Sequence, residues 1–67
     1  MNNNHRTRDA ILTYIEVDPE PRALHMITKY MHTMHKVDKG ATRESVHRLY
    51  KRGLLVRTSR GYYGVKR

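Results

Sequence analysis

The spacing of the apolar residues changes at Gly53. Before Gly53, apolar residues recur every three or four positions, as is typical of amphipathic helices. After it, Leu54–Thr58 and Tyr62–Lys66 have the period of two expected of strands, and Ser59-Arg60-Gly61 predicts a tight turn between them. Because an isolated two-stranded hairpin is only marginally stable, this hairpin must pack on the preceding helices.

Two helices are expected in the first half of the chain. The first runs from Thr7, a suitable N-cap, to Val17, and the second runs from Pro21, which is well suited to start a helix, to His35. The buried stripes predicted for them are Ile11, Tyr14 and Ile15 in the first helix and Leu24, Ile27, Met31 and Met34 in the second.

A third helix follows a turn at residues 36–40 and ends at Arg52, since Gly53 suits a left-handed helix stop. Asp38 and Thr42 are alternative N-caps for this helix. Its predicted inward face consists of Val46, Leu49 and Tyr50. Three helices followed by a C-terminal two-stranded β-hairpin predict a small α+β fold.

A chain of 67 residues is long enough for one domain. Residues 1–6 are polar and aperiodic, so we expect a flexible tail there and a folded domain over residues 7–67. The absence of cysteine excludes disulfides and thiolate metal sites. No stretch approaches the roughly 18 apolar residues of a membrane span, so we expect a soluble cytoplasmic protein, in the host cytoplasm or nucleoid, that makes no use of a membrane.

Positive charge is concentrated in the last third of the chain. Residues 43–67 contain eight Lys and Arg against the single acid Glu44, a net charge of +7, out of +8 for the whole chain. A basic surface confined to one helix and one hairpin is typical of nucleic-acid binding, and duplex DNA is the expected partner.

A helical wheel centred on the apolar face of the third helix places polar and basic residues opposite it. Glu44, Arg48 and Lys51 occupy the middle of that face, and its flanks are Arg43, Ser45, His47 and Arg52. Because a bidentate Arg matches guanine O6 and N7, Arg48 is the first candidate for a base contact and Arg43 the second. Glu44 either accepts a hydrogen bond from a cytosine amino group or orients a neighbouring Arg, and Ser45 and His47 reach bases or phosphates.

Other residues are expected to contact phosphates. Thr42 and the first backbone N–H groups of the third helix suit a phosphate, because helix N-termini attract anions. Lys39, Lys51 and Arg52 are predicted to contact the DNA backbone as point charges.

The segments SVHRLYKRGLLVR and RGYYGV, at the junction of the third helix and the hairpin, resemble the winged helix-turn-helix family. In this resemblance, residues 24–34 and 42–52 form the helix pair, 37–40 form its turn and 54–66 form the wing. The resemblance implies a three-helix DNA-binding domain whose third helix enters the major groove. The wing tip at Arg60 then inserts into the minor groove, and Arg57, Lys66 and Arg67 follow the backbone beside it.

The resemblance implies a sequence-specific DNA-binding protein, a small transcriptional regulator of the kind typical of phages, archaeal viruses and mobile elements. A domain of this size contacts about one half-site, so we expect a homodimer. The first helix and the Met-rich face of the second are candidate dimer surfaces. We expect neither an effector domain nor a small-molecule effector.

Two other functions use the same fold. One is a protein interaction module whose basic face binds an acidic protein, and the other is recognition of RNA or of a duplex that is not B-form. Tyr62 and Tyr63 either stack on sugars and bases or divide between the core and the cover of the sheet.

The sequence favours neither a metal site nor an active site. His25, His32 and His35 lack a matching carboxylate or thiolate, so we expect surface histidines and no cofactor. No catalytic motif is present and the core is thin, so we expect no enzyme activity.

Overall fold

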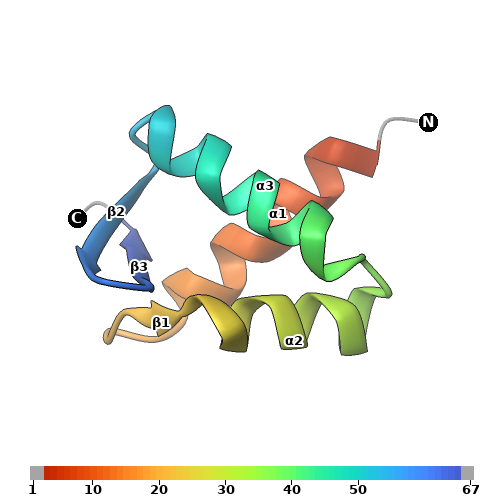
Figure 1. The fold of residues 1–67 in the computed structure, drawn as a ribbon, viewed down its shortest axis with the longest axis horizontal. Coiled ribbons are helices and arrows are strands. Elements are labelled where there is room, and N and C mark those ends of the chain that lie inside the picture. The colour runs from red at the N-terminus through yellow and green to blue at the C-terminus, as the bar shows by residue number, and fades with distance from the viewer. Residues whose placement is uncertain (1–2, 66–67) are drawn as a thin grey trace.

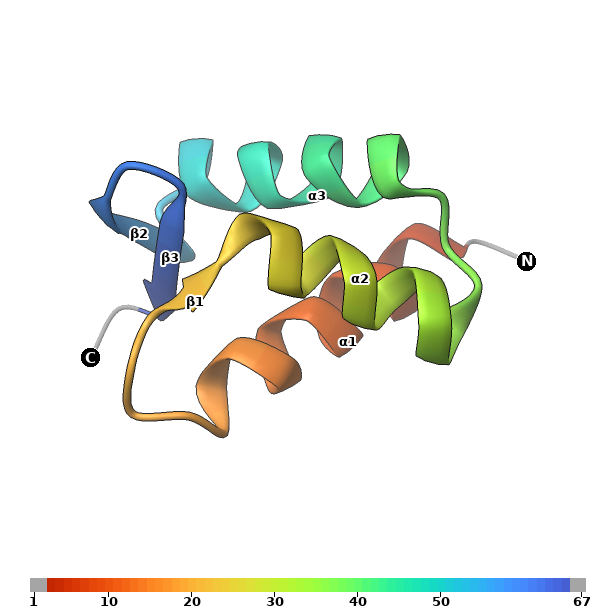
Figure 2. The ribbon, with the colours of Figure 1, turned by 60° about the horizontal axis from the view of Figure 1, so that its bottom comes forward.

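The computed structural model describes residues 3–65, whose chain forms three helices and a three-stranded antiparallel sheet (Figure 1). The α+β fold class is therefore confirmed, and the arrangement is compatible with a winged-helix-like one. In chain order the elements are α1 (Asn3–Glu16), β1 (Arg22–Ala23), α2 (Leu24–His35), α3 (Lys39–Lys51), β2 (Leu55–Ser59) and β3 (Tyr62–Val65). The sheet lies at one end of the helices, where β3 is the central strand between β1 and β2 (Figure 2).

Helix α1 begins earlier than the sequence predicted. It starts at Asn3 instead of Thr7, so residues 3–6, expected in a flexible tail, form its first turn. None of these residues is Gly or Pro, and nothing in their backbone chemistry stops a helix from extending. Ile11 and Ile15 are fully buried as predicted, and Tyr14 is half-buried. None of the helices in the described part of the chain is long and apolar enough to cross a membrane.

Helix α2 begins at Leu24, and the sequence prediction of a start at Pro21 is wrong. Arg22 and Ala23 instead form β1, which pairs with Tyr63 and Tyr62 of β3. The backbone N–H of Leu24 donates to the carbonyl of Gly61 over 2.7 Å, so the sheet takes up a donor that a helix start leaves free. The expected two-stranded hairpin is therefore part of a three-stranded sheet.

Helix α3 is capped by Asp38, one of the two predicted N-caps. The Asp38 carboxylate accepts a hydrogen bond from the Gly40 N–H over 2.9 Å, and the helix begins at Lys39. At the other end, Gly53 has φ of 79°, and the Leu54 N–H donates to the Leu49 carbonyl over 2.9 Å. The predicted left-handed stop at Gly53 is confirmed.

The core lies where the three helices meet the sheet. Its fully or almost fully buried apolar residues are Ile11, Ile15, Ile27, Met31, Val46, Leu49 and Leu55. The prediction of a buried side chain is wrong at two positions. Met34 is 65% exposed because it lies in the last turn of α2, at the rim of the core, and Tyr50 is 39% exposed because it covers the sheet, edge-on to the Tyr63 ring.

The β2–β3 hairpin is confirmed, with Leu55 opposite Val65 and Arg57 opposite Tyr63. The register shifts between Arg57 and Ser59, and the tip consists of Arg60 and Gly61. Gly61 has φ of 77°, a conformation that favours glycine. Tyr63 packs against the core while Tyr62 is exposed, which matches the predicted division of the tyrosine pair.

Candidate nucleic-acid interface

The outer face of α3 consists of the exposed residues Arg43, Glu44, His47, Arg48 and Lys51. The helical-wheel prediction is confirmed for these five, because Val46 and Leu49 on the opposite side are buried. Arg43, Glu44, His47 and Arg48 together line a shallow hollow on this face. Ser45, predicted beside them, is half-buried.

An ion pair joins Arg48 and Glu44 across one turn of α3. Arg48 Nη2 lies 3.7 Å from Glu44 Oε2, and both side chains are largely exposed. Such a surface pair contributes little to stability, at most about 1 kcal/mol. This contact is the one that the second predicted role of Glu44, orienting a neighbouring Arg, requires.

Thr42 does not lie on this surface. Its side chain is fully buried, and its hydroxyl donates to the Asp38 carbonyl over 3.2 Å. The predicted phosphate contact by the Thr42 side chain is wrong, because the helix begins at Lys39, three residues before Thr42, and the Thr42 side chain lies on its buried face. The Asp38 carboxylate already occupies the helix N-terminus, where a phosphate was expected.

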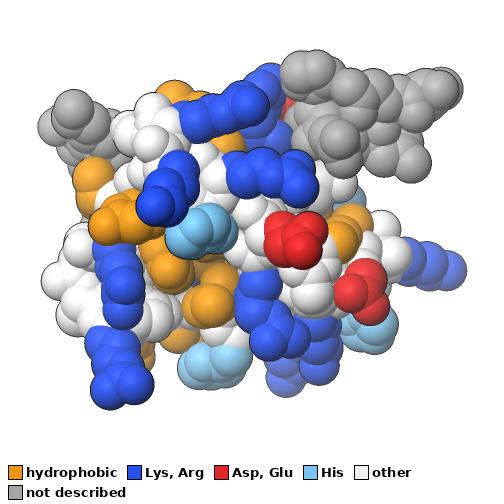
Figure 3. Space-filling model, turned by 45° about the horizontal axis from the view of Figure 1, so that its top comes forward, with side chains coloured by type: hydrophobic (Ala, Val, Ile, Leu, Met, Phe, Trp, Pro, Cys, Tyr) orange, Lys and Arg blue, Asp and Glu red, His pale blue; other side chains and the backbone are white. Residues whose placement is uncertain are grey.

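Basic side chains extend well beyond the outer face of α3. Seen from the side on which α3 lies, Lys and Arg side chains are spread over the molecule, with histidines and hydrophobic side chains between them and few acidic side chains (Figure 3). Exposed basic residues therefore also come from elements other than α3, such as Lys29 of α2 and Arg57 of β2.

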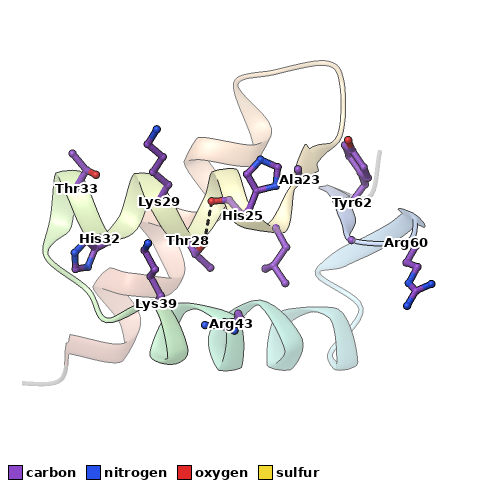
Figure 4. A pocket seen from close by; sticks show the side chains of 12 residues that line it. Ala23, His25, Thr28, Lys29, His32, Thr33, Lys39, Arg43, Arg60 and Tyr62 are labelled. Carbon is purple, nitrogen blue, oxygen red and sulfur yellow. Dashed lines mark hydrogen bonds between the residues drawn. The ribbon is translucent and has the colours of Figure 1, made fainter.

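A groove runs between α2 and α3 and ends at the hairpin tip (Figure 4). This α2–α3 groove is lined by Ala23, Leu24, His25, Thr28, Lys29, His32, Thr33, Lys39, Arg43, Arg60, Gly61 and Tyr62. It brings together four predicted DNA-binding residues from two separate elements, namely Lys39, Arg43, Arg60 and Tyr62. None of its lining residues is acidic.

Three groove residues of α2 were missed as binding candidates by the sequence reasoning. The sequence analysis predicts only surface positions for His25 and His32, although His25, Lys29 and His32 recur at i, i+4 and i+7 and so share one face of the helix. That spacing is the signal that identifies them. Thr28 also lines the groove, and its hydroxyl donates to the His25 carbonyl over 3.0 Å.

Three further predicted site residues line neither the groove nor the hollow. Lys51 and Arg52 are exposed at the C-terminal end of α3, and Arg57 is exposed on β2, so none of them lines the groove or the hollow. Lys66 and Arg67 are outside the described residues.

Arg22 illustrates a basic residue with a structural role. It forms an ion pair with Asp18 at 3.3 Å, and its guanidinium lies 4.1 Å from the centre of the Tyr14 ring. Tyr14 in turn stacks on Tyr30, with the ring centres 4.0 Å apart. These contacts hold α1, β1 and α2 together, so Arg22 is engaged within the fold.

The geometry offers no metal centre among the residues that the structure describes, where no three His, Asp or Glu side chains gather. A scan of protein-family models, a search of curated proteins and a search of solved structures found no match to this chain.

Proposed function

We propose that this protein binds duplex DNA sequence-specifically, as a winged helix-turn-helix regulator of transcription. The observation that carries the proposal is the continuity of positive charge: the outer face of α3 and the acid-free α2–α3 groove share Arg43. The element order, with a short strand before α2 and a hairpin after α3, is the support from the fold.

In the proposed complex, α3 enters the major groove. Its 13 residues form a rod about 20 Å long, and the major groove, about 12 Å wide, accepts one such helix. Arg48 gives up its weak pairing with Glu44 to donate to guanine O6 and N7. Arg43, His47 and Lys51 add contacts to neighbouring bases or phosphates.

A homodimer on a palindromic site is part of the proposal. One copy of this small domain contacts about one half-site, and two copies double the length of sequence that is read. The regulator would act in the compartment that holds the DNA, the host cytoplasm or nucleoid.

Selection of bound duplexes from a random pool tests this function directly. We expect enrichment of a palindromic consensus. Fluorescence anisotropy titrations of that duplex should give a log K against log salt slope near −5, which corresponds to about six phosphate contacts. The absence of binding to any duplex at low salt would refute DNA binding, and selective binding to an acidic protein would then favour the interaction-module alternative.

A further inference from the structure

The α2–α3 groove has the composition of a site for phosphate oxygens. Its lining residues include Lys29, Lys39, Arg43 and Arg60 and two histidines, but no Asp or Glu. None of the salt bridges found within residues 3–65 involves these four cations. Their charges are thus free for an anionic ligand, which would release their counterions on binding.

The hairpin end of the groove has a different chemistry. The buried Ala23 and the half-buried Leu24 line it there, and the exposed Tyr62 ring lies at its edge. A nucleic-acid backbone alternates apolar sugar carbons with charged phosphates. The apolar surface near the hairpin suits the sugars, with the Tyr62 ring as its broadest part, and the neighbouring cations suit the phosphates.

The hairpin tip is held against α2 and does not project away from the helices. The 2.7 Å hydrogen bond between the Leu24 N–H and the Gly61 carbonyl, with the pairing of Ala23 and Tyr62, holds Arg60 at the end of the groove. At the other side of the groove, Arg43 also lines the hollow that contains Arg48. A strand lying in the groove would therefore continue past Arg43 to the residues proposed to read bases.

We propose that the α2–α3 groove binds the sugar–phosphate backbone of one DNA strand, and that Arg60 serves this groove instead of a flanking minor groove. The inference rests on the proposed DNA-binding function and adds where one strand lies. The groove supplies affinity that is independent of sequence, while the outer face of α3 supplies the selectivity.

The charge-removing variants Lys29→Gln and Arg60→Gln test this placement. Each should make the salt slope shallower by about 0.9 and weaken binding equally on the selected duplex and on a scrambled one. Lys36→Gln is the matched control, since it removes the same charge from the end of α2 outside the groove and should leave the slope unchanged. Circular dichroism of each variant confirms that it is folded.

The flanking sequence separates the two roles of Arg60. Duplexes with A-tract or G·C flanks should bind the protein equally well. An A-tract preference that Arg60→Gln abolishes would overturn the inference, because it would place Arg60 in a narrow minor groove.

A free polyphosphate carries the same phosphate oxygens as a DNA backbone and is the alternative ligand for the groove. Tripolyphosphate is the probe, followed through the imidazole NMR signals of His25 and His32, and we expect only weak, salt-sensitive shifts. Saturable micromolar binding that Lys29→Gln abolishes, with an unchanged DNA salt slope, would overturn the inference in favour of a small anionic ligand. If both groove variants bind the duplex with an unchanged slope of log K against log salt, the groove does not bind the backbone and only this inference fails. If the protein binds no duplex at low salt, the proposed function fails as well.

Discussion

At the scale of single residues, two of the three cations on the outer face of α3 have different surroundings. Arg48 is paired with Glu44 in the free protein, whereas Lys51 lies one turn nearer to the end of the helix and outside the hollow. A planar guanidinium donates to a guanine in fixed geometry, while an ammonium group acts as a point charge. The two residues should therefore differ in selectivity.

We predict that Arg48→Ala costs about 1–3 kcal/mol on the selected duplex and relaxes preference at one base pair, because a bidentate base contact is lost. Lys51→Ala should weaken selected and scrambled duplexes to the same extent. Anisotropy titrations on duplexes mutated at each position measure both effects. Equal behaviour of the two variants would show that the proposed orientation of α3 in the groove is wrong.

A second residue-scale prediction concerns Thr42. Thr42→Val should lower the free energy of unfolding by about 1 kcal/mol, since it removes the hydroxyl that donates to the Asp38 carbonyl and keeps the buried volume. The DNA affinity of the folded variant should not change. Urea unfolding and anisotropy measure these quantities, and Thr13→Val, on the exposed side of α1, is the control. Weaker DNA binding by folded Thr42→Val would restore its predicted phosphate contact.

At the scale of secondary structure, the hairpin is joined to the helices at its tip. Gly61 has the positive φ that the turn requires, and its carbonyl accepts from the first N–H of α2. The turn and the start of α2 are therefore coupled, and a strained tip should weaken both.

We predict that Gly61→Ala destabilises the protein by about 1–2 kcal/mol, since an L side chain disfavours this backbone conformation. No atom lies within 4 Å of the added Cβ, so a clash does not contribute. Gly61→Asn should cost less, because Asn tolerates a positive φ better than Ala. Urea unfolding ranks the variants, and equal losses for Ala and Asn would contradict this explanation.

At the scale of the whole molecule, a net charge of +8 on 67 residues opposes compaction. Like charges also meet away from the proposed interface, where Arg6 and Lys36 line one hollow beside Met34. Salt should therefore stabilise the free protein and weaken the proposed binding to DNA, two opposite effects of the same screening.

We predict that the thermal midpoint of the free protein rises between low and moderate salt, whereas that of the DNA complex falls. Differential scanning calorimetry of both samples measures this. The double variant Arg6→Gln/Lys36→Gln should show a smaller rise in the free protein, because less repulsion remains to be screened. A free protein whose midpoint falls with salt would contradict the repulsion argument.

Much of the fold was predictable from local chemistry. Ile11, Ile15, Ile27, Met31, Val46 and Leu49 follow helical spacing and are buried, while Gly53 and Gly61 end a helix and form a turn as expected. Six of the seven residues expected on the exposed face of α3 are exposed, because the direction of one buried stripe on a helix determines the direction of every other side chain. The phosphate contact predicted for Thr42 was wrong because it depended on which of two residues, Asp38 or Thr42, is the N-cap of the helix.

Local spacing and turn residues were sufficient to predict the three helices, the hairpin and the basic outer face of α3, because each of these features depends on residues within a single element. Three features became visible only in the folded structure: Arg22 and Ala23 form a strand, Met34 and Tyr50 lie at the surface, and α2 contributes to the basic groove. Each of these depends on contacts between segments far apart in the chain. The groove needs α2, α3 and the hairpin side by side, and no local pattern specifies that juxtaposition.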